Sequence, residues 1–497
     1  MLFSSMIFLW VFLPMVLAGY FLILKLPIRK RRVKRKATNI FLLIVSLFFY
    51  AWGGIYYLFI MIFIILTNYL GGLALTKWDG KPRQKKAALV LTLFLNLAIL
   101  FFFKYFNMSV AVIESLALYV GEGGSLKAAL FGMQGTGALG IAEVALPVGI
   151  SFYTFQAMSY VVDVYRGRAK QQRNLLNFAL YVSLFPQLIA GPVVQYADVK
   201  KQFTDRRESL WDFACGQKRF CYGLAKKVLI ANTLAEVADS IWALETAKLG
   251  AAMAWLGLLA YTFQIYYDFS GYSDMAIGLG RMFGFRWKEN FRYPYIALSI
   301  REFWQRWHIS LSAWFKEYVY IPLGGNRGSK FRTCRNVFLV FLLTGIWHGA
   351  NFTFVVWGLL YAALQIIERL FLGRLLDKNP IKLLNWLYVF LAVMAGWVYF
   401  RSDNVFTANE YIRQLFVFGG YREYNVLSYL SVKVLAAFVL ALSGMGFAQR
   451  ALNGVYEKIQ CRLPVLVLDQ VLQIAMLAVS VFSLVVGTYN PFIYFQF

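Results

Sequence analysis

The chain contains two histidines, His308 and His348, and both lie in unusual settings. His348 stands in the segment Thr-Gly-Ile-Trp-His-Gly-Ala (344–350), inside an otherwise apolar run that we expect to cross a membrane. An ionisable side chain there costs several kcal/mol unless it faces a cavity or a polar partner, so it marks a candidate functional site. A neutral imidazole suits the role of general base for a hydroxyl, because its ordinary pKa lies near the working pH. A structural hydrogen bond to a neighbouring helix is the alternative interpretation.

Two small residues, Gly345 and Gly349, flank His348 four positions apart. This spacing lets another backbone or a substrate approach closely, although it serves plain helix packing as well. Trp347 and Gly349, which adjoin His348 in the sequence, are candidates to line the cavity or tunnel that His348 would face.

Two acids at the end of another apolar run are further candidates for the tunnel lining. Asp268 and Asp274 lie in the segment Tyr-Tyr-Asp-Phe-Ser-Gly-Tyr-Ser-Asp (266–274). They could line the cavity or orient a base, but capping of a helix that begins at Met275 is about as well supported. We do not predict a catalytic role for either acid.

His308 ends the segment Arg-Glu-Phe-Trp-Gln-Arg-Trp-His (301–308), which is rich in charges and aromatic rings. Such a mixture can stack a planar group and pair with phosphates. An interfacial belt of Trp and Tyr with cations that reach toward the headgroups is the competing interpretation, and composition does not separate the two. On the first interpretation, the candidates for binding a donor molecule are Trp304, Arg306, Trp307, Ser312 and Trp314.

The four cysteines form no Cys-x-x-Cys pair, and no histidine lies at metal-ligand spacing from any of them. They are Cys215, Cys221, Cys334 and Cys461. We therefore predict no metal site, haem or disulfide framework, and we interpret the cysteines as structural and reduced.

The elements that position these residues must lie in a bilayer. A mean hydropathy of +0.58, with 60% hydrophobic and 18% aromatic residues over 497 positions, is too apolar for water-soluble domains. We expect an all-α, polytopic integral membrane protein with roughly 10–12 transmembrane helices of about 20 residues each. The net charge of +26 comes from short basic clusters between apolar runs, as in cytoplasmic loops, and no separate basic domain points to nucleic acid.

Basic loops predict the orientation of the first helices. Eight of the twelve residues from Lys25 to Lys36 are Lys or Arg, which places this loop in the cytoplasm. Residues 1–24 carry no charge and no cleavage site, so they form an uncleaved first span with an extracytoplasmic N-terminus. A Gly-rich turn at 51–54 then fits an outer hairpin, before Lys77 to Lys86 returns to the cytoplasm.

The middle of the chain predicts re-entrant and interfacial helices around a central funnel or tunnel. Only one apolar run lies between Arg173 and Lys200, and Gly191-Pro192 interrupts it. Such broken backbone is tolerated at membrane depth only where protein or a water-filled cavity surrounds it. The basic and aromatic region 281–335 suggests helices at the inner surface. No internal repeat is visible, which disfavours a secondary transporter.

These patterns predict one domain over residues 1–497. Its parts are N-terminal helices (1–280), a histidine-bearing catalytic core (281–371), and C-terminal helices that end in an aromatic hexapeptide (372–497).

An ordered set of short segments resembles the membrane-bound O-acyltransferase family, in its alginate O-acetyltransferase subgroup. The matching segments are residues 1–5, 49–52, 146–156, 267–274, 303–310, 320–326 and 347–349. The resemblance implies that His348 is the central catalytic histidine and that His308 is a second active-site position on the inner side. It also implies a tunnel, through which an acyl group passes from a cytoplasmic thioester donor to an extracytoplasmic acceptor.

The same resemblance implies the surroundings of the reaction. Acetyl-CoA or another acyl thioester is expected as co-substrate, with no bound cofactor. The expected partners are membrane lipid, a polysaccharide acceptor and a secreted or membrane-anchored esterase-like protein of the SGNH type, in a bacterial cytoplasmic membrane.

The final residues, Phe-Ile-Tyr-Phe-Gln-Phe (492–497), fit the pattern Phe-x-Tyr-x-x-Phe. This pattern is similar to the end of a small partner peptide in the teichoic-acid D-alanylation system, which implies an acyl relay on Tyr494. A phenol ionises near pH 10, so its ester is a better acyl donor than an alkyl ester. An aromatic terminus that anchors at the membrane interface is the simpler interpretation.

Other functions stay open at this point. They are transfer to teichoic acid, peptidoglycan or lipid, and, in a different class, export of a polysaccharide or lipid. An exporter should carry charges along a central pathway rather than one histidine on each side. By resemblance, the roughly 130 residues after Ile367 favour the polysaccharide subgroup over the shorter D-alanylation relatives.

Overall fold

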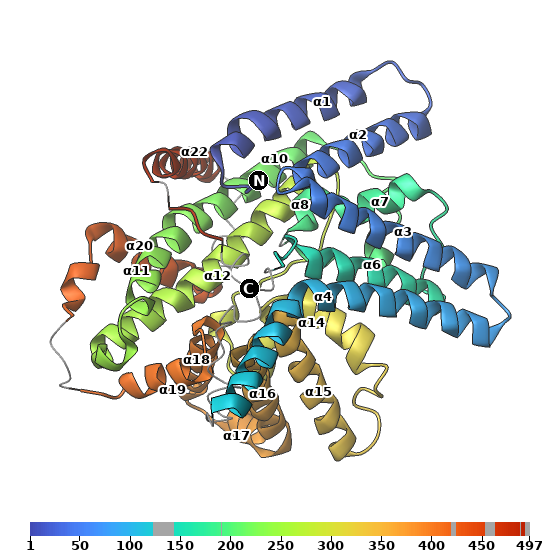
Figure 1. The fold of residues 1–497 in the computed structure, drawn as a ribbon. Helices are drawn as coiled ribbons and strands as arrows, with labels where there is room; N and C mark the ends of the chain where they lie inside the picture. The colour runs from blue at the N-terminus through green and yellow to red at the C-terminus, as the bar shows by residue number, and fades with distance from the viewer. Residues whose placement is uncertain (123–143, 190, 419–423, 453–462, 488, 493–497) are drawn as a thin grey trace.

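The computed structural model describes residues 1–122, 144–189, 191–418, 424–452, 463–487 and 489–492, and these residues form helices and connecting loops without a strand (Figure 1). Within these described ranges, six segments are long and apolar enough to cross a membrane: Phe8–Lys25, Ile55–Lys77, Pro82–Ile113, Phe352–Lys378, Lys382–Arg401 and Val467–Val486. The expected class, an all-α polytopic membrane protein, is confirmed. The sequence-based expectation was roughly 10–12 spans, counted from mainly apolar stretches, and six segments of the described residues meet the criteria of length and hydropathy.

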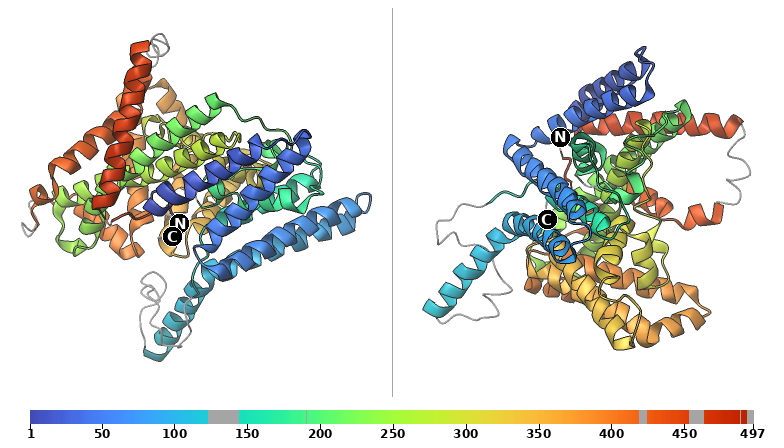
Figure 2. Two further views of the ribbon diagram at one scale, coloured as in Figure 1. Left: turned by 90° about the horizontal axis from the view of Figure 1, so that it is seen from above. Right: turned by 90° about the vertical axis from the view of Figure 1, so that its right-hand side faces the viewer.

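The N-terminal helices form successive hairpins along one side of the molecule (Figure 1). They are α1 (Leu13–Lys25), which continues a short π-helical turn (Phe8–Phe12), α2 (Arg31–Ala51), α3 (Ile55–Lys77) and α4 (Pro82–Glu122). The predicted turn between α2 and α3 is present, with Gly54 at φ +145°, a conformation that glycine adopts readily. The C-terminal end of α4 projects away from the other helices in both views of Figure 2.

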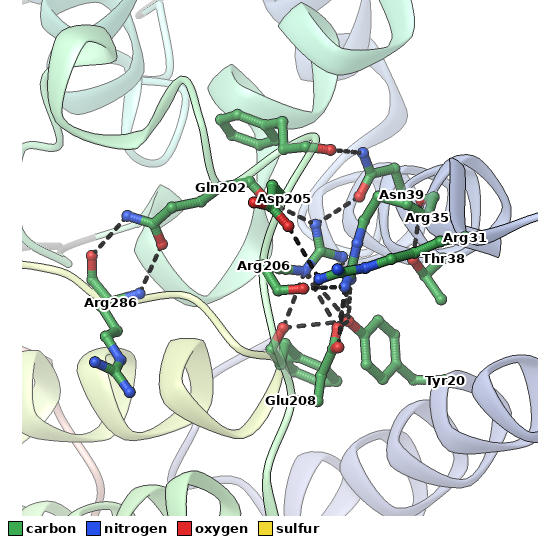
Figure 3. A network of polar contacts seen from close by, with 12 residues as sticks. Tyr20, Arg31, Arg35, Thr38, Asn39, Gln202, Asp205, Arg206, Glu208 and Arg286 are labelled. Atoms are coloured by element: carbon green, nitrogen blue, oxygen red, sulfur yellow. Dashed lines mark hydrogen bonds and ion pairs between the residues drawn. The ribbon is translucent and has the colours of Figure 1, made fainter. Parts of the chain in front are cut away.

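A buried polar network ties the start of α2, which contains the second half of the basic segment 25–36, to the segment before α10 (Figure 3). The guanidinium of Arg35 donates to the carboxylate of Glu208 at 2.5 and 3.0 Å, and Arg206 donates to Asn39 at 2.6 Å. Burial by itself raises the pKa of Glu208, but the hydrogen bonds from Arg35 and Tyr20 outweigh it and hold that pKa below its usual range. The start of α10 therefore lies on the same side of the molecule as the basic loop.

The central helices combine short broken segments with one long helix. They are α6 (Ile150–Tyr165), α7 (Leu175–Ser183), α8 (Phe185–Leu188), α9 (Tyr196–Val199), α10 (Leu210–Ala225), α11 (Asn232–Trp242) and α12 (Gly250–Met282), with the π-helical turn η2 (Lys226–Ala231) between α10 and α11. Buried α7 and α8 are too short to cross a bilayer, which agrees with the predicted re-entrant segment. Helices α10 and α12 pack closely, because a Cβ at Gly223 would lie only 2.6 Å from the carbonyl oxygen of Gly271.

Two short helices come before the longer helices of the C-terminal part of the chain. The elements are α13 (Ile300–Arg306), α14 (Ile309–Phe315), α15 (Lys330–His348), α16 (Phe352–Ile367), α17 (Gly373–Lys378), α18 (Lys382–Arg401), α19 (Val405–Gln414), α20 (Val432–Gly444) and α22 (Leu463–Val486). Helices α15 and α16 form a tight hairpin, since a Cβ at Gly345 would collide with the carbonyl oxygen of Phe354. The two helices of this hairpin present His348 at their turn.

Candidate active site

His348 is the last residue of α15, where the chain leaves the helix through extended backbone at Gly349. The apolar run around His348 is therefore a helical hairpin, not the single crossing that the sequence suggested. A Cβ at Gly349 would collide with the ring of Phe354, so the turn requires glycine at this position. The pair of glycines thus serves packing of α15 against α16, and the hairpin places the imidazole at a helix end rather than in mid-helix.

The His348 side chain is 7% exposed and is surrounded by aromatic rings. Its ring centroid lies 5.0 Å from that of Trp357 and 5.1 Å from that of Phe400, both edge to face. The imidazole nevertheless borders a cavity of about 120 Å³, together with Trp347 and the segment 146–152. A cavity of this size holds a few small groups, so His348 is not sealed in hydrocarbon.

His308 is the N-cap of α14 and has left-handed backbone (φ +42°), which is uncommon for a residue other than glycine. Its side chain is 1% exposed, and Nδ1 lies 3.2 Å from Oδ1 of Asn290. Because an amide oxygen can only accept, the proton resides on Nδ1. Nε2 is then an acceptor, and it has no hydrogen-bond partner in the described part of the chain.

Trp347 brings the two histidines together. Its ring centroid lies 4.9 Å from that of His348 and 6.5 Å from that of His308. Phe152 completes this wall, 5.7 Å from Trp347 and 6.3 Å from His308. Two histidines that are 40 positions apart in the sequence therefore border one continuous aromatic wall.

The five donor-binding candidates do not share one site. Trp304 and Ser312 line a mainly apolar cavity of about 210 Å³ between α14 and α15. Arg306 pairs with Glu302 at 2.8 Å, Trp307 packs 4.9 Å from Trp397, and Trp314 stacks on a phenylalanine ring of α6 at 3.9 Å. Their role in donor binding stays a prediction.

The two acids differ from the sequence-based interpretation in one respect. Helix α12 runs without interruption from Gly250 to Met282, so neither acid caps a helix that begins at Met275. Asp268 forms a buried ion pair with Lys227 at 2.7 Å. Asp274 pairs with two cations of α10 and η2, Arg219 at 2.8 Å and Lys226 at 2.7 Å, and it lines a large cleft.

Tyr494 lies outside the described residues. The segment before it is held in the interior of the protein: Phe492 is buried against Tyr272, with ring centroids 4.6 Å apart, and the ammonium of Lys227 donates to the carbonyl of Pro491. Among the described residues, no group of His, Cys, Asp and Glu side chains could hold a metal ion.

Sequence reasoning missed Lys104 of α4. Its ammonium donates to the carbonyl oxygens of Trp347 and, at 2.8 Å, of His348, and it lines the cavity beside the imidazole. A lone lysine inside an apolar run is itself a functional signal, so the rule that selected His348 also applies to Lys104.

An all-helical membrane protein with a buried histidine beside a cavity fits the class of membrane-embedded acyl-transfer enzymes. A model of the MBOAT, or membrane-bound O-acyltransferase, family matches residues 92–402, and the chain belongs to this family. It is therefore an O-acyltransferase that requires an acyl donor. Membership in this family favours the acyltransferase over the alternative of an exporter.

The relatives cover nearly the whole chain. The probable alginate O-acetylase AlgI of Pseudomonas putida is 41% identical over 100% of both proteins. The protein of the same name from Pseudomonas aeruginosa is 43% identical over 90% of this chain and 82% of its own length. The peptidoglycan O-acetyltransferase of Helicobacter pylori is 35% identical over 83% of this chain and 79% of its own length.

Proposed function

We propose that this enzyme transfers an acetyl or other short acyl group from a cytoplasmic thioester, acetyl-CoA, to an extracytoplasmic polysaccharide, with His348 as general base. The observation that carries the proposal is the position of His348, which is buried among aromatic rings yet borders a cavity. A base in such a site is shielded from water but can still reach a substrate hydroxyl. The full-length likeness to alginate O-acetylases supports a polysaccharide as the acceptor.

A cleft of about 1,020 Å³ between α10, α12 and residues 288–293 suits the entry of the donor. Six cations and two acids line it: Lys218, Arg219, Lys226, Arg281, Lys288 and Arg292, with Asp274 and Glu289. Three of these cations also pair with carboxylates outside the lining, Asp198, Asp212 and Asp469. The cations can bind the phosphates of a nucleotide thioester when these ion pairs exchange. The hydroxyls of Ser270 and Ser273 line the cleft, are buried and lack a partner among the described residues, so they are available to a ligand.

One end of the cleft lining lies near the start of α2. Asp212, at the start of α10, pairs with Arg281 of the cleft lining at 3.0 Å, and nearby Glu208 pairs with Arg35. A donor in the cleft is close to His308, because the ring of Phe291 lines the cleft and stacks on the imidazole at 6.3 Å. Nε2 of His308, an acceptor, would then take a hydrogen bond from an amide N–H of the CoA arm that carries the thioester.

His348 lies deeper in the membrane than the entry of the cleft. Helix α4 begins next to the basic loop of residues 77–86, and a rise of 1.5 Å per residue puts Lys104 about 33 Å along its path. The hydrocarbon layer is roughly 30 Å thick. Since Lys104 bonds the carbonyl of His348, the imidazole lies toward the extracytoplasmic side. The same orientation gives an extracytoplasmic N-terminus in a bacterial cytoplasmic membrane.

The reaction needs two proton transfers, one to His348 and one from it. His348 takes the proton of the acceptor hydroxyl, and the oxygen attacks the thioester carbonyl, which becomes a tetrahedral oxyanion. The oxyanion collapses, the carbon–sulfur bond breaks, and the thiolate receives the proton from the imidazolium. The acceptor is the polysaccharide itself, the serine of an esterase-like partner, or Tyr494 as an intermediate carrier.

Peptidoglycan is the second candidate acceptor, because a relative that is 35% identical over most of the chain is a peptidoglycan O-acetyltransferase. Both acceptors present sugar hydroxyls, so the mechanism at His348 is the same.

Complementation of a bacterial strain from which this protein has been deleted tests the proposal. The wild-type protein and His348→Ala are each expressed in this strain at equal abundance in the membrane. Ester-linked acetate is then measured separately on the exopolysaccharide and on peptidoglycan. We expect wild type, but not His348→Ala, to restore acetate on the exopolysaccharide. Restoration only on peptidoglycan would change the acceptor, and full restoration by His348→Ala would overturn the mechanism.

A further inference from the structure

Lys104 reaches the active site from a distant part of the chain. It lies on α4, whereas His348 ends α15, and its ammonium bridges the last two carbonyl oxygens of that helix. The C-terminus of a helix carries partial negative charge, which favours a cation there. Two of the three ammonium hydrogens are engaged in this way, and the third is available to the cavity.

Three groups that carry positive charge or can donate a hydrogen bond line the same cavity as His348. They are the Lys104 ammonium, the indole of Trp347 and the N-terminus of α6, where Gly149 provides no side-chain cap. The Trp347 Nε1 is buried and has no acceptor among the described residues. The ammonium lies 5.5 Å from the Trp347 ring centroid, so the cation and the indole lie close together. Groups of this kind are suited to a developing negative charge.

We propose that the Lys104 ammonium binds the oxyanion that forms when the acceptor hydroxyl attacks the thioester carbonyl. This inference rests on the proposed function. In the step, a carbon–oxygen bond forms, the hydroxyl proton moves to His348, and the carbonyl electron pair moves to its oxygen, which accepts the remaining Lys104 hydrogen. When the carbonyl reforms, the carbon–sulfur bond breaks and the thiolate takes the proton from His348. Lys104 keeps its own protons throughout.

Tyr105 provides a matched comparison with Lys104. Its hydroxyl donates to the carbonyl of Ile346, so it also caps the last turn of α15. Tyr105 is absent from the described residues that line the cavity, whereas Lys104 is among them. Loss of Tyr105 therefore reports on capping alone, and loss of Lys104 reports on capping and on the oxyanion.

The test compares Lys104→Arg, Lys104→Gln, Tyr105→Phe and His348→Ala in purified enzyme, with acetyl-CoA as donor and the acetylated polysaccharide as product. Gln keeps two N–H donors for the carbonyls but removes the charge. We expect Lys104→Gln to lower kcat about 100-fold with little change in the KM for acetyl-CoA. Lys104→Arg and Tyr105→Phe should stay within about tenfold of wild type, the range of one hydrogen bond.

Two results would overturn the assignment. One is a kcat of Lys104→Gln within tenfold of wild type; the other is an equal loss in Lys104→Arg and Lys104→Gln, which would attribute the defect to packing. Thermal unfolding in detergent confirms that each variant is folded. His348→Ala separates this inference from the proposed function: its full activity would refute both, whereas its inactivity beside an active Lys104→Gln refutes only the role of Lys104.

Discussion

The side-chain oxygen of Asn290 holds His308 in one tautomer. Oδ1 of Asn290 lies 3.2 Å from Nδ1 of His308 and also accepts hydrogen bonds from the hydroxyl and the backbone N–H of Ser310, at 2.8 and 3.2 Å. Asn290 is fully buried, so these contacts are shielded from water. They stabilise the left-handed backbone of His308 and leave Nε2 as a hydrogen-bond acceptor.

Replacing Asn290 should therefore impair the function of His308 while the His308 side chain itself is unchanged. We expect Asn290→Ala to lower acyl transfer by at least about tenfold, because it removes the acceptor that orients the ring. Ser310→Ala is the control: it removes one donor to Asn290 and the acceptor of the Val193 N–H, but it keeps the contact of Asn290 with His308. Initial rates of CoA release measure the effect, and equal rates for the two variants would argue against this orientation.

Loss of His348 should abolish the chemistry and preserve the fold. We expect His348→Ala and His348→Gln to lower turnover by about 100-fold or more, the usual contribution of a general base. Both variants should insert into membranes and elute as wild type in gel filtration. Measurable turnover close to that of wild type would exclude His348 as the base.

Tyr494→Phe tests the acyl relay. The substitution keeps the aromatic ring and deletes the hydroxyl oxygen that an acyl ester requires. If Tyr494 carries the acyl group, transfer stops and no acetyl label from acetyl-CoA remains on the protein. If the C-terminus only anchors the chain, activity and membrane insertion are unchanged.

The hairpin that presents His348 depends on close approach of α15 and α16. We expect Gly345→Val to destabilise the protein by about 1–3 kcal/mol, since the added side chain overlaps the carbonyl of Phe354. Gly53→Ala is the control, because the nearest atom to its added Cβ, the carbonyl oxygen of Tyr50, is 3.5 Å away. Unfolding midpoints in detergent compare the two, and equal midpoints would contradict the packing.

Acid should weaken the network around Glu208. Its pKa is below the usual value in the folded protein, so its ionised form stabilises the fold above the unfolded pKa of about 4.3. This contribution is lost as the pH falls through the folded pKa. Unfolding midpoints of wild type should therefore drop between pH 6 and pH 3 more steeply than those of Glu208→Gln. Parallel curves would show that the carboxylate makes no such contribution.

The sequence by itself identified the class of protein and pointed to His348 as the candidate catalytic residue. In a bilayer, the backbone N–H and C=O groups of a long apolar run must form hydrogen bonds within their own segment. Such a run therefore forms a helix. An imidazole within such a run is costly enough to mark His348 as a candidate functional residue without any structure. The ordered motifs then indicated the family, which the comparison over residues 92–402 confirmed.

Tertiary structure decided how that residue is held. The run around His348 has the composition of a crossing, and only the packing of α16 against α15 shows that it is a hairpin. Lys104 and His348 are 244 positions apart, and Lys227 and Asp268 pair across two helices, so no local pattern links either pair. Such contacts depend on which helix faces pack together. Periodicity predicts that a helix forms and which face is apolar, but the partner of each face is selected only when the whole bundle assembles.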